Sequence, residues 1–238
     1  MKIILQKLIA QTGFASRRAA EKMIQLGQVK VNGISAKVGD MADENDKISV
    51  RGKVIGNVKE KIYIKMNKPA GYTCTTRTFK DEKNIYSLAQ SMPTGVFPVG
   101  RLDKDSRGLL LLTNDGDLAL ILSHPRFAHE KIYEVRVPND ITDESASHAK
   151  DAFLKGINFG QEEGVAKAKK VTYLQNGLFE ITLAEGKKRQ LRRMFSDVKI
   201  KVLDLKRIKF AGLELGRLPE GKWGYLNKAE VDKLKKIS

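Results

Sequence analysis

The sequence predicts an α+β protein in which a small α/β domain precedes a larger domain, built on a mainly antiparallel mixed sheet flanked by helices. Helical periodicity and a hairpin signal both occur within roughly the first fifty residues. From residue 62 onward, segments that alternate apolar and polar residues predominate. The stretch between them is polar and weakly patterned, which predicts a linker. We therefore expect domains at 1–52 and 62–238, joined by a linker at 53–61.

The first domain is expected to begin with two short helices. Apolar residues at helical spacing predict the first helix, which ends near Gly13. Ser16 is a favourable N-cap for the second helix, and Leu26-Gly27 is a typical helix end. Residues 29–33 alternate into an Asn-Gly turn, which predicts a β-hairpin, and residues 47–50 predict a further strand.

The larger domain is expected to combine strands with three helices. Alternation predicts strands at 62–66, 132–137, 171–174 and 178–183. The aliphatic run at 109–112 predicts a buried strand. Helical patterns occupy 143–155, 189–195 and 228–237, and Asn227 is expected to cap the last of them.

The charge balance is strongly basic. Forty-four Lys and Arg stand against 28 Asp and Glu, which gives a formal net charge of +16. Such an excess favours a polyanionic partner, because neutralised phosphates release counterions. A membrane surface is the competing polyanion. However, the sequence has no amphipathic helix with a basic and a bulky apolar face, and no run near the roughly 20 apolar residues of a spanning helix. Nucleic acid is therefore the favoured partner, and no membrane is expected.

Cysteine and histidine usage narrows the class of protein further. Cys74 is the single cysteine and cannot form an internal disulfide, and the N-terminus becomes charged too early for a secretory signal. Both observations favour the cytoplasm. The three histidines, His124, His129 and His148, lack Cys or carboxylate partners at ligand spacing, so no metal site is expected.

One acid occupies an unusual place in the chain. Asp103 lies between Arg101 and Lys104, in a short loop that leads directly into the aliphatic run. Loops anchored on a buried segment can hold a reactive group in fixed geometry. A reactive Asp103 would make the chain an enzyme, whereas an Asp that only forms a turn would leave it a simple binder.

Two other segments of the larger domain carry unusual residues. Tyr133 lies on the alternating strand at 132–137. Residues 185–194 run from a strand end through a glycine turn into a basic helix, with five cations among residues 187–193. Cations at this density near a helix start indicate a phosphate nearby.

An ordered pattern runs through the first domain. Its members are Leu5, Leu8, Gly13, Ser16-Arg17-Arg18, Ala20, Ile24, Gly27, Val29, Val31-Asn32-Gly33, Asp46, Ile48 and Val50. This pattern resembles the S-four-type RNA-binding domain, whose basic helix and first hairpin face RNA. The resemblance implies RNA contacts by Arg17, Arg18, Lys30 and Asn32. Because positive charge in a first helical turn opposes the helix dipole, a phosphate partner is favoured over a merely solvated helix start.

A second ordered pattern covers the larger domain. Its members are Asn67-Lys68-Pro69-Ala70-Gly71, Phe97 to Asp103, Ser106, Gly108 to Gly116, Lys131-Ile132-Tyr133, Glu185-Gly186 and Arg189 to Met194. These motifs resemble the pseudouridine synthases that modify ribosomal RNA, in the branch that carries an S-four-type domain. The resemblance covers nearly the whole chain. It implies an isomerase with the pseudouridine synthase fold and ribosomal RNA as partner, and without metal or other cofactor; we expect a monomer.

The resemblance also implies roles for individual residues. It assigns the catalytic aspartate to Asp103, the tyrosine that stacks on the target base to Tyr133, and the arginine that pairs with the aspartate to Arg192. Further RNA contacts are expected from Arg101, Lys187, Lys188, Arg189 and Arg193, and pocket support from Leu102, Gly108, Leu109, Gln190 and Leu191.

The chemistry explains why such a set is needed. Pseudouridine formation breaks the bond between base and ribose, rotates the base and rejoins it through carbon 5, so the base must leave its stack. A carboxylate can act as nucleophile or can deprotonate the ribose to give a glycal-like intermediate, and the sequence leaves both routes open. Burial disfavours an ionised carboxylate, whereas an adjacent guanidinium from Arg192 or Arg101 favours it. A tyrosine face contributes about 1–3 kcal/mol of stacking to a flipped base.

Two functions remain open at this point. The favoured one is isomerisation of a specific uridine in ribosomal RNA, with the large-subunit 23S RNA preferred to the small-subunit 16S RNA. The alternative is a non-catalytic RNA-binding factor in ribosome assembly, in which Asp103 would be idle.

Overall fold

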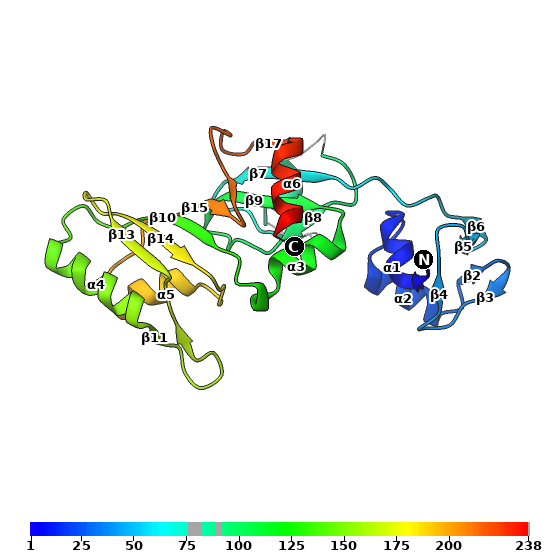
Figure 1. The fold of residues 1–238 in the computed structure, drawn as a ribbon, viewed down its shortest axis with the longest axis horizontal. Helices are drawn as coiled ribbons and strands as arrows, with labels where there is room; N and C mark the ends of the chain where they lie inside the picture. The colour runs from blue at the N-terminus through cyan, green and yellow to red at the C-terminus, as the bar shows by residue number, and fades with distance from the viewer. Residues whose placement is uncertain (76–81, 89–91, 238) are drawn as a thin grey trace. The chain divides into compact units, whose positions relative to one another are not determined.

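The computed structural model describes residues 1–75, 82–88 and 92–237. Residues 76–81, 89–91 and 238 of the predicted larger domain lie outside the described residues. The chain forms two compact units, one of Met1–Ile62 with Pro93–Val96 and one of Tyr63–Met92 with Phe97–Ser238. Both units combine helices and strands (Figure 1), and the predicted α+β class is confirmed.

The small unit contains the two expected helices, α1 (Leu5–Gln11) and α2 (Arg17–Gln25). The Ser16 hydroxyl caps α2, since it accepts a hydrogen bond from the Ala19 N–H at 3.2 Å. Leu5, Ile9 and the other inward-facing apolar residues of both helices share one core with the strands that follow. The predicted helical periodicity therefore marks the buried faces.

Strands complete the small unit. A four-stranded sheet has the order β3-β2-β5-β6, and β1 pairs with β4 in a separate two-stranded sheet. The strands are β1 (Ile3–Ile4), β2 (Val29–Val31), β3 (Ile34–Ser35), β4 (Met41–Ala42), β5 (Ile48–Val50) and β6 (Lys53–Val54). Asn32 and Gly33, with φ of 51° and 84°, form the tight turn between β2 and β3.

The stretch expected to be a linker, 53–61, begins as part of this unit. Lys53 and Val54 form β6 and pair with β5, and Ile55 and Val58 pack against the small core. The physical reason is local: Gly52, with φ of 79°, lets the chain turn back directly after β5. Composition suggested a linker because few apolar side chains of this stretch, Ile55 and Val58, reach the core.

The larger unit is built on one nine-stranded sheet. Its main path runs β13-β14-β10-β15-β9-β7-β17, with β16 paired to β15 and β8 paired to β9. All of its pairings are antiparallel except that of β9 with β15. The strands are β7 (Tyr63–Lys68), β8 (Phe97–Val99), β9 (Arg107–Thr113), β10 (Lys131–Arg136), β13 (Lys170–Tyr173), β14 (Leu178–Leu183), β15 (Asp204–Phe210), β16 (Leu213–Glu214) and β17 (Trp223–Tyr225).

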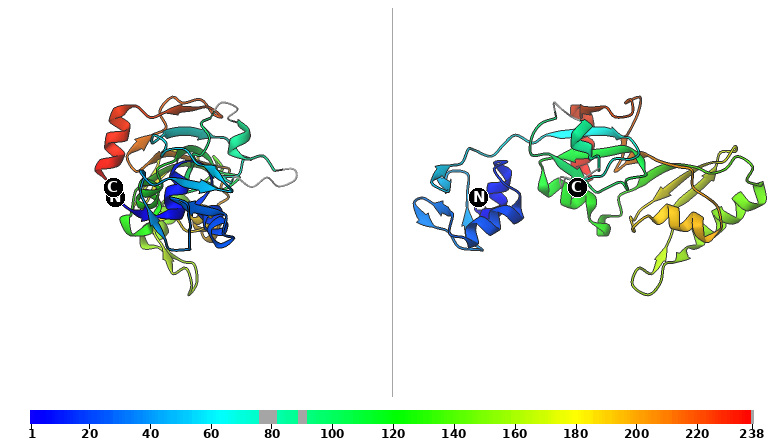
Figure 2. Two further views of the ribbon diagram at one scale, coloured as in Figure 1. Left: turned by 90° about the vertical axis from the view of Figure 1, so that its right-hand side faces the viewer. Right: turned by 180° about the vertical axis from the view of Figure 1, so that it is seen from behind.

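Helices cover the two ends of this sheet, as Figures 1 and 2 show. At one end α4 (Asp143–Lys155) and α5 (Gln190–Asp197) pack with β10, β13 and β14 around one apolar core. At the other end α3 (Gly116–Ser123) and α6 (Lys228–Lys236) pack with β7 and β9 around a second core. The remaining elements are the 3-10 turns Ile85–Leu88 and Pro125–Phe127 and the hairpin of β11 (Ile157–Asn158) and β12 (Val165–Ala166). β9, β15 and β10 join the two ends.

The expected helices are confirmed within a residue or two at each end. Asn227 forms the predicted cap of α6 and shares a reciprocal capping box with Glu230. Among the described residues, no helix has both the length and the apolar character that crossing a membrane requires.

Candidate active site

The loop that carries Asp103 is fixed at both ends. On the C-terminal side it enters β9, where Gly108 lies beside Arg207 in the parallel pairing with β15. Gly108 has φ of 104°, and a Cβ atom there would lie 2.3 Å from the Arg207 carbonyl oxygen. Only glycine fits such a close approach. The strand contact therefore fixes where the Asp103 loop leaves the sheet.

A buried lysine organises the backbone of the same loop. Lys68, at the end of β7, is fully buried. Its ammonium donates to the carbonyl oxygens of Pro69, Asp103, Lys104 and Ser106, at 3.0, 3.1, 3.3 and 2.6 Å. Burial lowers the pKa of Lys68, and neighbouring acidic groups oppose that shift. The ammonium thus fixes three backbone carbonyls of the 103–106 turn. The backbone of the half-buried Asp103 is therefore held in place, and this limits the directions in which its side chain can point.

Tyr133 reaches the site from the centre of the sheet. It lies on β10, is 9% exposed, and lines the same cavity as Asp103. The pairing of β10 with β15 shifts register between Ile132 and Tyr133. Such an irregularity redirects a side chain relative to a regular strand and is common next to active sites.

The basic segment begins α5 with a strained turn. Arg189 has φ of 51°, a conformation that side chains rarely adopt. Gln190 is buried and stabilises this turn: its amide oxygen accepts from the Lys187 N–H at 3.0 Å, and its amide nitrogen donates to Glu185 at 2.7 Å. Gln190 therefore supports the turn that carries the cations.

Asp105 connects the Asp103 loop to the basic segment at the start of α5. Arg189 donates to both carboxylate oxygens of Asp105 at 2.9 Å, and Arg192 donates to the Asp105 carbonyl oxygen at 2.8 Å. The hydrogen bonds from Arg189 hold the pKa of Asp105 below its ordinary value, and the charge of Arg192 adds to the effect. The expected partner of Arg192 was Asp103, but its ion pair in this structure is with Asp105, at 3.3 Å. Arg189 and Arg192 are three residues apart, so one carboxylate can meet both.

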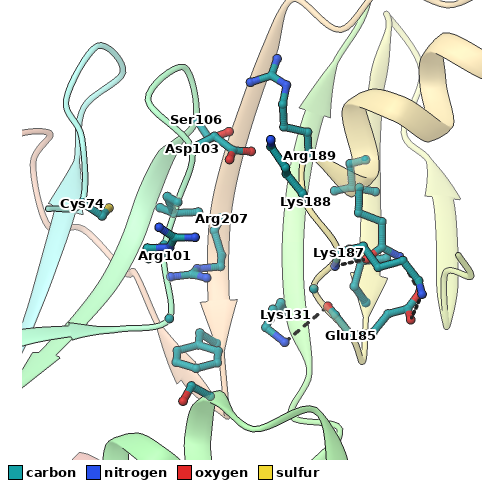
Figure 3. Close-up of a pocket in the computed structure, with 18 of the residues that line it drawn as sticks. Cys74, Arg101, Asp103, Ser106, Lys131, Glu185, Lys187, Lys188, Arg189 and Arg207 are labelled. Carbon is teal, nitrogen blue, oxygen red and sulfur yellow. Dashed lines mark hydrogen bonds and ion pairs between the residues drawn. The ribbon is translucent and has the colours of Figure 1, made fainter. Parts of the chain in front are cut away.

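These elements surround one cavity of about 860 Å³. Figure 3 shows Asp103, Lys188 and Arg189 toward one end of it, Lys131 and Glu185 toward the other, and Arg101 and Arg207 along the wall between them. The described lining residues include seven Lys or Arg and three Asp or Glu: Arg101, Lys104, Lys131, Lys187, Lys188, Arg189 and Arg207, with Glu82, Asp103 and Glu185. The cavity is therefore strongly cationic.

The structure brings most of the predicted site residues of the larger domain together. Those that line the cavity are Arg101, Leu102, Asp103, Tyr133, Lys187, Lys188, Arg189, Gln190 and Leu191. Gly108 and Leu109 in β9 and Arg192 in α5 are not among the lining residues. Arg193 is held by Glu163 at 2.7 Å and stacks on Phe159, so in this structure it is engaged with the hairpin β11–β12.

The predicted RNA contacts of the small unit lie on its surface. Arg17, Arg18, Lys30 and Asn32 are all exposed. The Asn32 side chain is already used within the unit, because it donates to Asp46 at 2.7 Å and accepts from the Lys47 N–H at 2.9 Å. A structural role in the hairpin therefore accounts for Asn32.

Sequence reasoning missed two buried cations, Lys68 and Arg207, and the half-buried Lys131. Lys68 and Lys131 lie inside the motifs that resemble the pseudouridine synthases, but the resemblance implies no role for either. Arg207 sits in β15, where the alternation of Asp204–Phe210 places it on a buried face with Leu205. A charged residue at an inward position of a strand was the available signal. Over residues 1–75, 82–88 and 92–237, no group of three or more potential metal ligands occurs.

The fold and this cavity define the class of protein as an enzyme that acts on RNA. A family model described as RNA pseudouridylate synthase matches residues 62–197, and one for the S4 domain matches residues 5–48. The chain belongs to the RNA pseudouridylate synthase family and carries an N-terminal S4 domain; it is a pseudouridine synthase, an isomerase.

Relatives match along nearly the whole chain. An RNA pseudouridine synthase of Aquifex aeolicus is 38% identical, with 98% of this chain and 94% of the relative covered. Ribosomal large subunit pseudouridine synthase B of Bacillus subtilis is 35% identical, with 98% and 96% covered. The dual-specificity RNA pseudouridine synthase RluF of Escherichia coli K12 is 35% identical, with 98% and 78% covered. A crystal structure of a pseudouridylate synthase matches with a TM-score of 0.68 at 30% identity and covers 98% of this chain and 99% of its own.

Proposed function

We propose that this protein isomerises a specific uridine of ribosomal RNA to pseudouridine in the cytoplasm, acting as a monomer on free RNA or a pre-ribosomal particle. The observation that carries the proposal is the shared cavity of Asp103 and Tyr133, surrounded by cations. Residues 1–52 would tether the RNA and residues 62–238 would carry the chemistry. The name of the Bacillus subtilis relative, which acts on the large subunit, favours 23S RNA over 16S RNA.

Each residue of the cavity has a task in this reaction. The flipped uracil stacks on Tyr133, whose buried position excludes water from one face of the base. Asp103 then attacks the ribose or removes a ribose proton, and either route frees the base to turn within the cavity. Arg192 supports the negative charge of the Asp103 loop from α5. Arg101, Lys187, Lys188 and Arg189 contact the RNA backbone at the cavity, Arg193 does so beside it, and Arg17, Arg18 and Lys30 do so on the small unit.

The test is tritium release from ribosomal RNA labelled at uracil carbon 5, because the isomerisation replaces the hydrogen at that position. Separate 23S and 16S transcripts are compared, and the modified uridine is then mapped. Release from 23S RNA is the expected result. Release from 16S RNA alone would contradict the preference for the large subunit. RNA binding without release from either would favour the non-catalytic assembly factor.

Asp105→Asn is expected to lower kcat about tenfold without raising KM for RNA. The substitution removes the ion pairs of the Asp105 carboxylate with Arg189 and Arg192 and keeps the hydrogen bond from Arg192 to the Asp105 carbonyl oxygen, so the Asp103 loop is held less firmly against α5. It also frees the Arg189 guanidinium to contact a phosphate, so RNA affinity is kept or improved. The slope of log affinity against log salt concentration should then become steeper by about one phosphate contact. Because the hydrogen bonds from Arg189 lower the pKa of Asp105, the carboxylate stays ionised and keeps its ion pairs at neutral pH, and it loses them only at acid pH, as the pH falls through that lowered pKa.

Glu163→Gln is the matched control for this prediction. It makes the same change of charge and frees Arg193, another cation of α5, but it touches neither Asp103 nor its loop. The control should leave kcat unchanged. A rise in KM with constant kcat for Asp105→Asn would show that Asp105 contributes to binding and not to alignment.

A further inference from the structure

Arg207 is a buried cation, and no carboxylate of the described residues pairs with it. It is 2% exposed, and its Nε donates to the Leu109 carbonyl oxygen at 2.8 Å. Its Nη2 is buried and has no hydrogen-bond partner among the described residues. Its ring contact is with Phe210, whose centroid lies 4.9 Å from the guanidinium carbon. A buried guanidinium in this state is costly unless a ligand supplies negative charge.

A second cation lies beside Arg207 on the same wall. Within the part of the chain that the structure describes, Lys131 donates hydrogen bonds to two neutral carbonyl oxygens, those of His129 at 3.2 Å and Glu185 at 3.4 Å. Burial lowers the pKa of Lys131, and repulsion from Arg207 lowers it further, against a weaker opposing effect of Glu185. The Glu185 carboxylate is directed elsewhere, since one of its oxygens accepts from both Gln190 and the Lys167 N–H. The two cations therefore repel each other on one wall of the cavity.

The chemistry of the wall selects an anion. Arg101 is exposed and lines the same cavity as Arg207 and Lys131 (Figure 3), so a third cation is available there. A uracil carbonyl could accept a hydrogen bond from Arg207, but it is neutral and would leave the repulsion between Arg207 and Lys131 in place. A phosphodiester offers several acceptor oxygens and a full negative charge, and it binds guanidinium groups strongly in a water-poor site.

We propose that Arg207 and Lys131 form a phosphate-binding site inside the cavity, which holds the phosphodiester next to the target uridine. The proposal deepens the proposed function and rests on it. Fixing that phosphate orients the ribose toward Asp103 while the base turns, because the ribose and its phosphate stay attached to the chain when the bond to the base is broken. The site thereby holds the part of the substrate that must not move.

Calorimetric titration of the intact protein tests the site without turnover. Uridine, 5′-uridine monophosphate and 3′-uridine monophosphate are compared at constant ionic strength. One of the two nucleotides is expected to bind at least about tenfold more tightly than uridine, and the better one shows which phosphate is held. Arg207→Gln should reduce that advantage to about twofold or less, and Lys131→Met should reduce it at least about threefold.

Lys209→Met is the matched control. It removes one positive charge from the same strand, but Lys209 pairs with Glu214 at 2.9 Å outside the cavity. It should keep the full advantage of the nucleotide over uridine. If Arg207→Gln fails to fold, Lys131→Met decides alone.

The proposed phosphate site would be contradicted if the wild type bound uridine and both nucleotides equally. It would also be contradicted if the wild type bound neither nucleotide detectably. A full nucleotide advantage in every variant that folds would also overturn it. Failure of the proposed function looks different, because the wild type would then bind nucleotide but release no tritium from ribosomal RNA.

Discussion

Asp103→Asn is expected to reduce tritium release from ribosomal RNA at least about 10³-fold, which corresponds to about 4 kcal/mol of transition-state stabilisation. An amide of the same shape can neither attack the ribose nor accept a proton from it. The Lys68 ammonium bonds the Asp103 backbone and not its side chain, so the loop should keep its position. RNA affinity should change less than about twofold, because the predicted phosphate contacts come from other residues.

Three measurements distinguish a loss of chemistry from unfolding, weaker RNA binding or a general disturbance of the loop. Tryptophan fluorescence follows unfolding of the larger unit, since Trp223 in β17 is the single tryptophan of the chain. The midpoint should match that of the wild type. RNA binding by filter retention should be unchanged. Asp105→Asn, two residues away, should retain about a tenth of the activity. More than a tenth of wild-type release from Asp103→Asn would exclude Asp103 as the reacting group.

Gly108→Ala is expected to destabilise the larger unit by at least about 3 kcal/mol, which is a large share of the stability of an ordinary domain. The added Cβ would lie 2.3 Å from the Arg207 carbonyl oxygen and 2.7 Å from its nitrogen, and φ of 104° is unfavourable for alanine. β9 and β15 would have to separate at the point where they hold both the Asp103 loop and Arg207. Urea unfolding followed by Trp223 fluorescence measures the change.

Gly116→Ala is the control for this substitution. Gly116 begins α3, and a Cβ atom there would meet nothing within 4 Å. Alanine favours a helix over glycine, so stability should be unchanged or higher by up to about 1 kcal/mol. If Gly108→Ala matched this control, β9 and β15 would be able to separate at little cost, and the strand contact would not fix the loop.

Local patterns predicted most of the elements because each pattern reflects burial of one face. The spacing of Leu5 and Ile9, the alternation of 178–183 and the cap at Asn227 all correspond to real elements. The order of strands in the large sheet could not be read in this way. Only β9 with β15 is parallel, and these strands lie about a hundred residues apart, so their pairing depends on packing of the whole unit.

The candidate site shows the same division. Ordered motifs singled out Asp103, Tyr133 and the basic helix, and the structure places the first two at one cavity together with Arg189. The motifs did not show that Arg192 pairs with Asp105. Asp103 and Asp105 are two residues apart in one turn, and the sequence does not say which of the two carboxylates faces α5. Nor did the motifs give a role to Lys68 or Arg207, since a lysine or arginine in a strand is usually solvated.

The sequence by itself determined a basic α+β protein with one distinctive acid and favoured an RNA-modifying enzyme over a simple RNA binder, because residue order and periodicity are properties of the chain alone. Only the tertiary structure decided which charges meet. It joined Asp105 to Arg189 and Arg192, and it placed the buried Arg207 near the half-buried Lys131 with no ion pair from either to a carboxylate of the described residues. The reason is physical: the energy of a charge depends on its distance to other charges and on its burial, and both are fixed only when distant strands pack together.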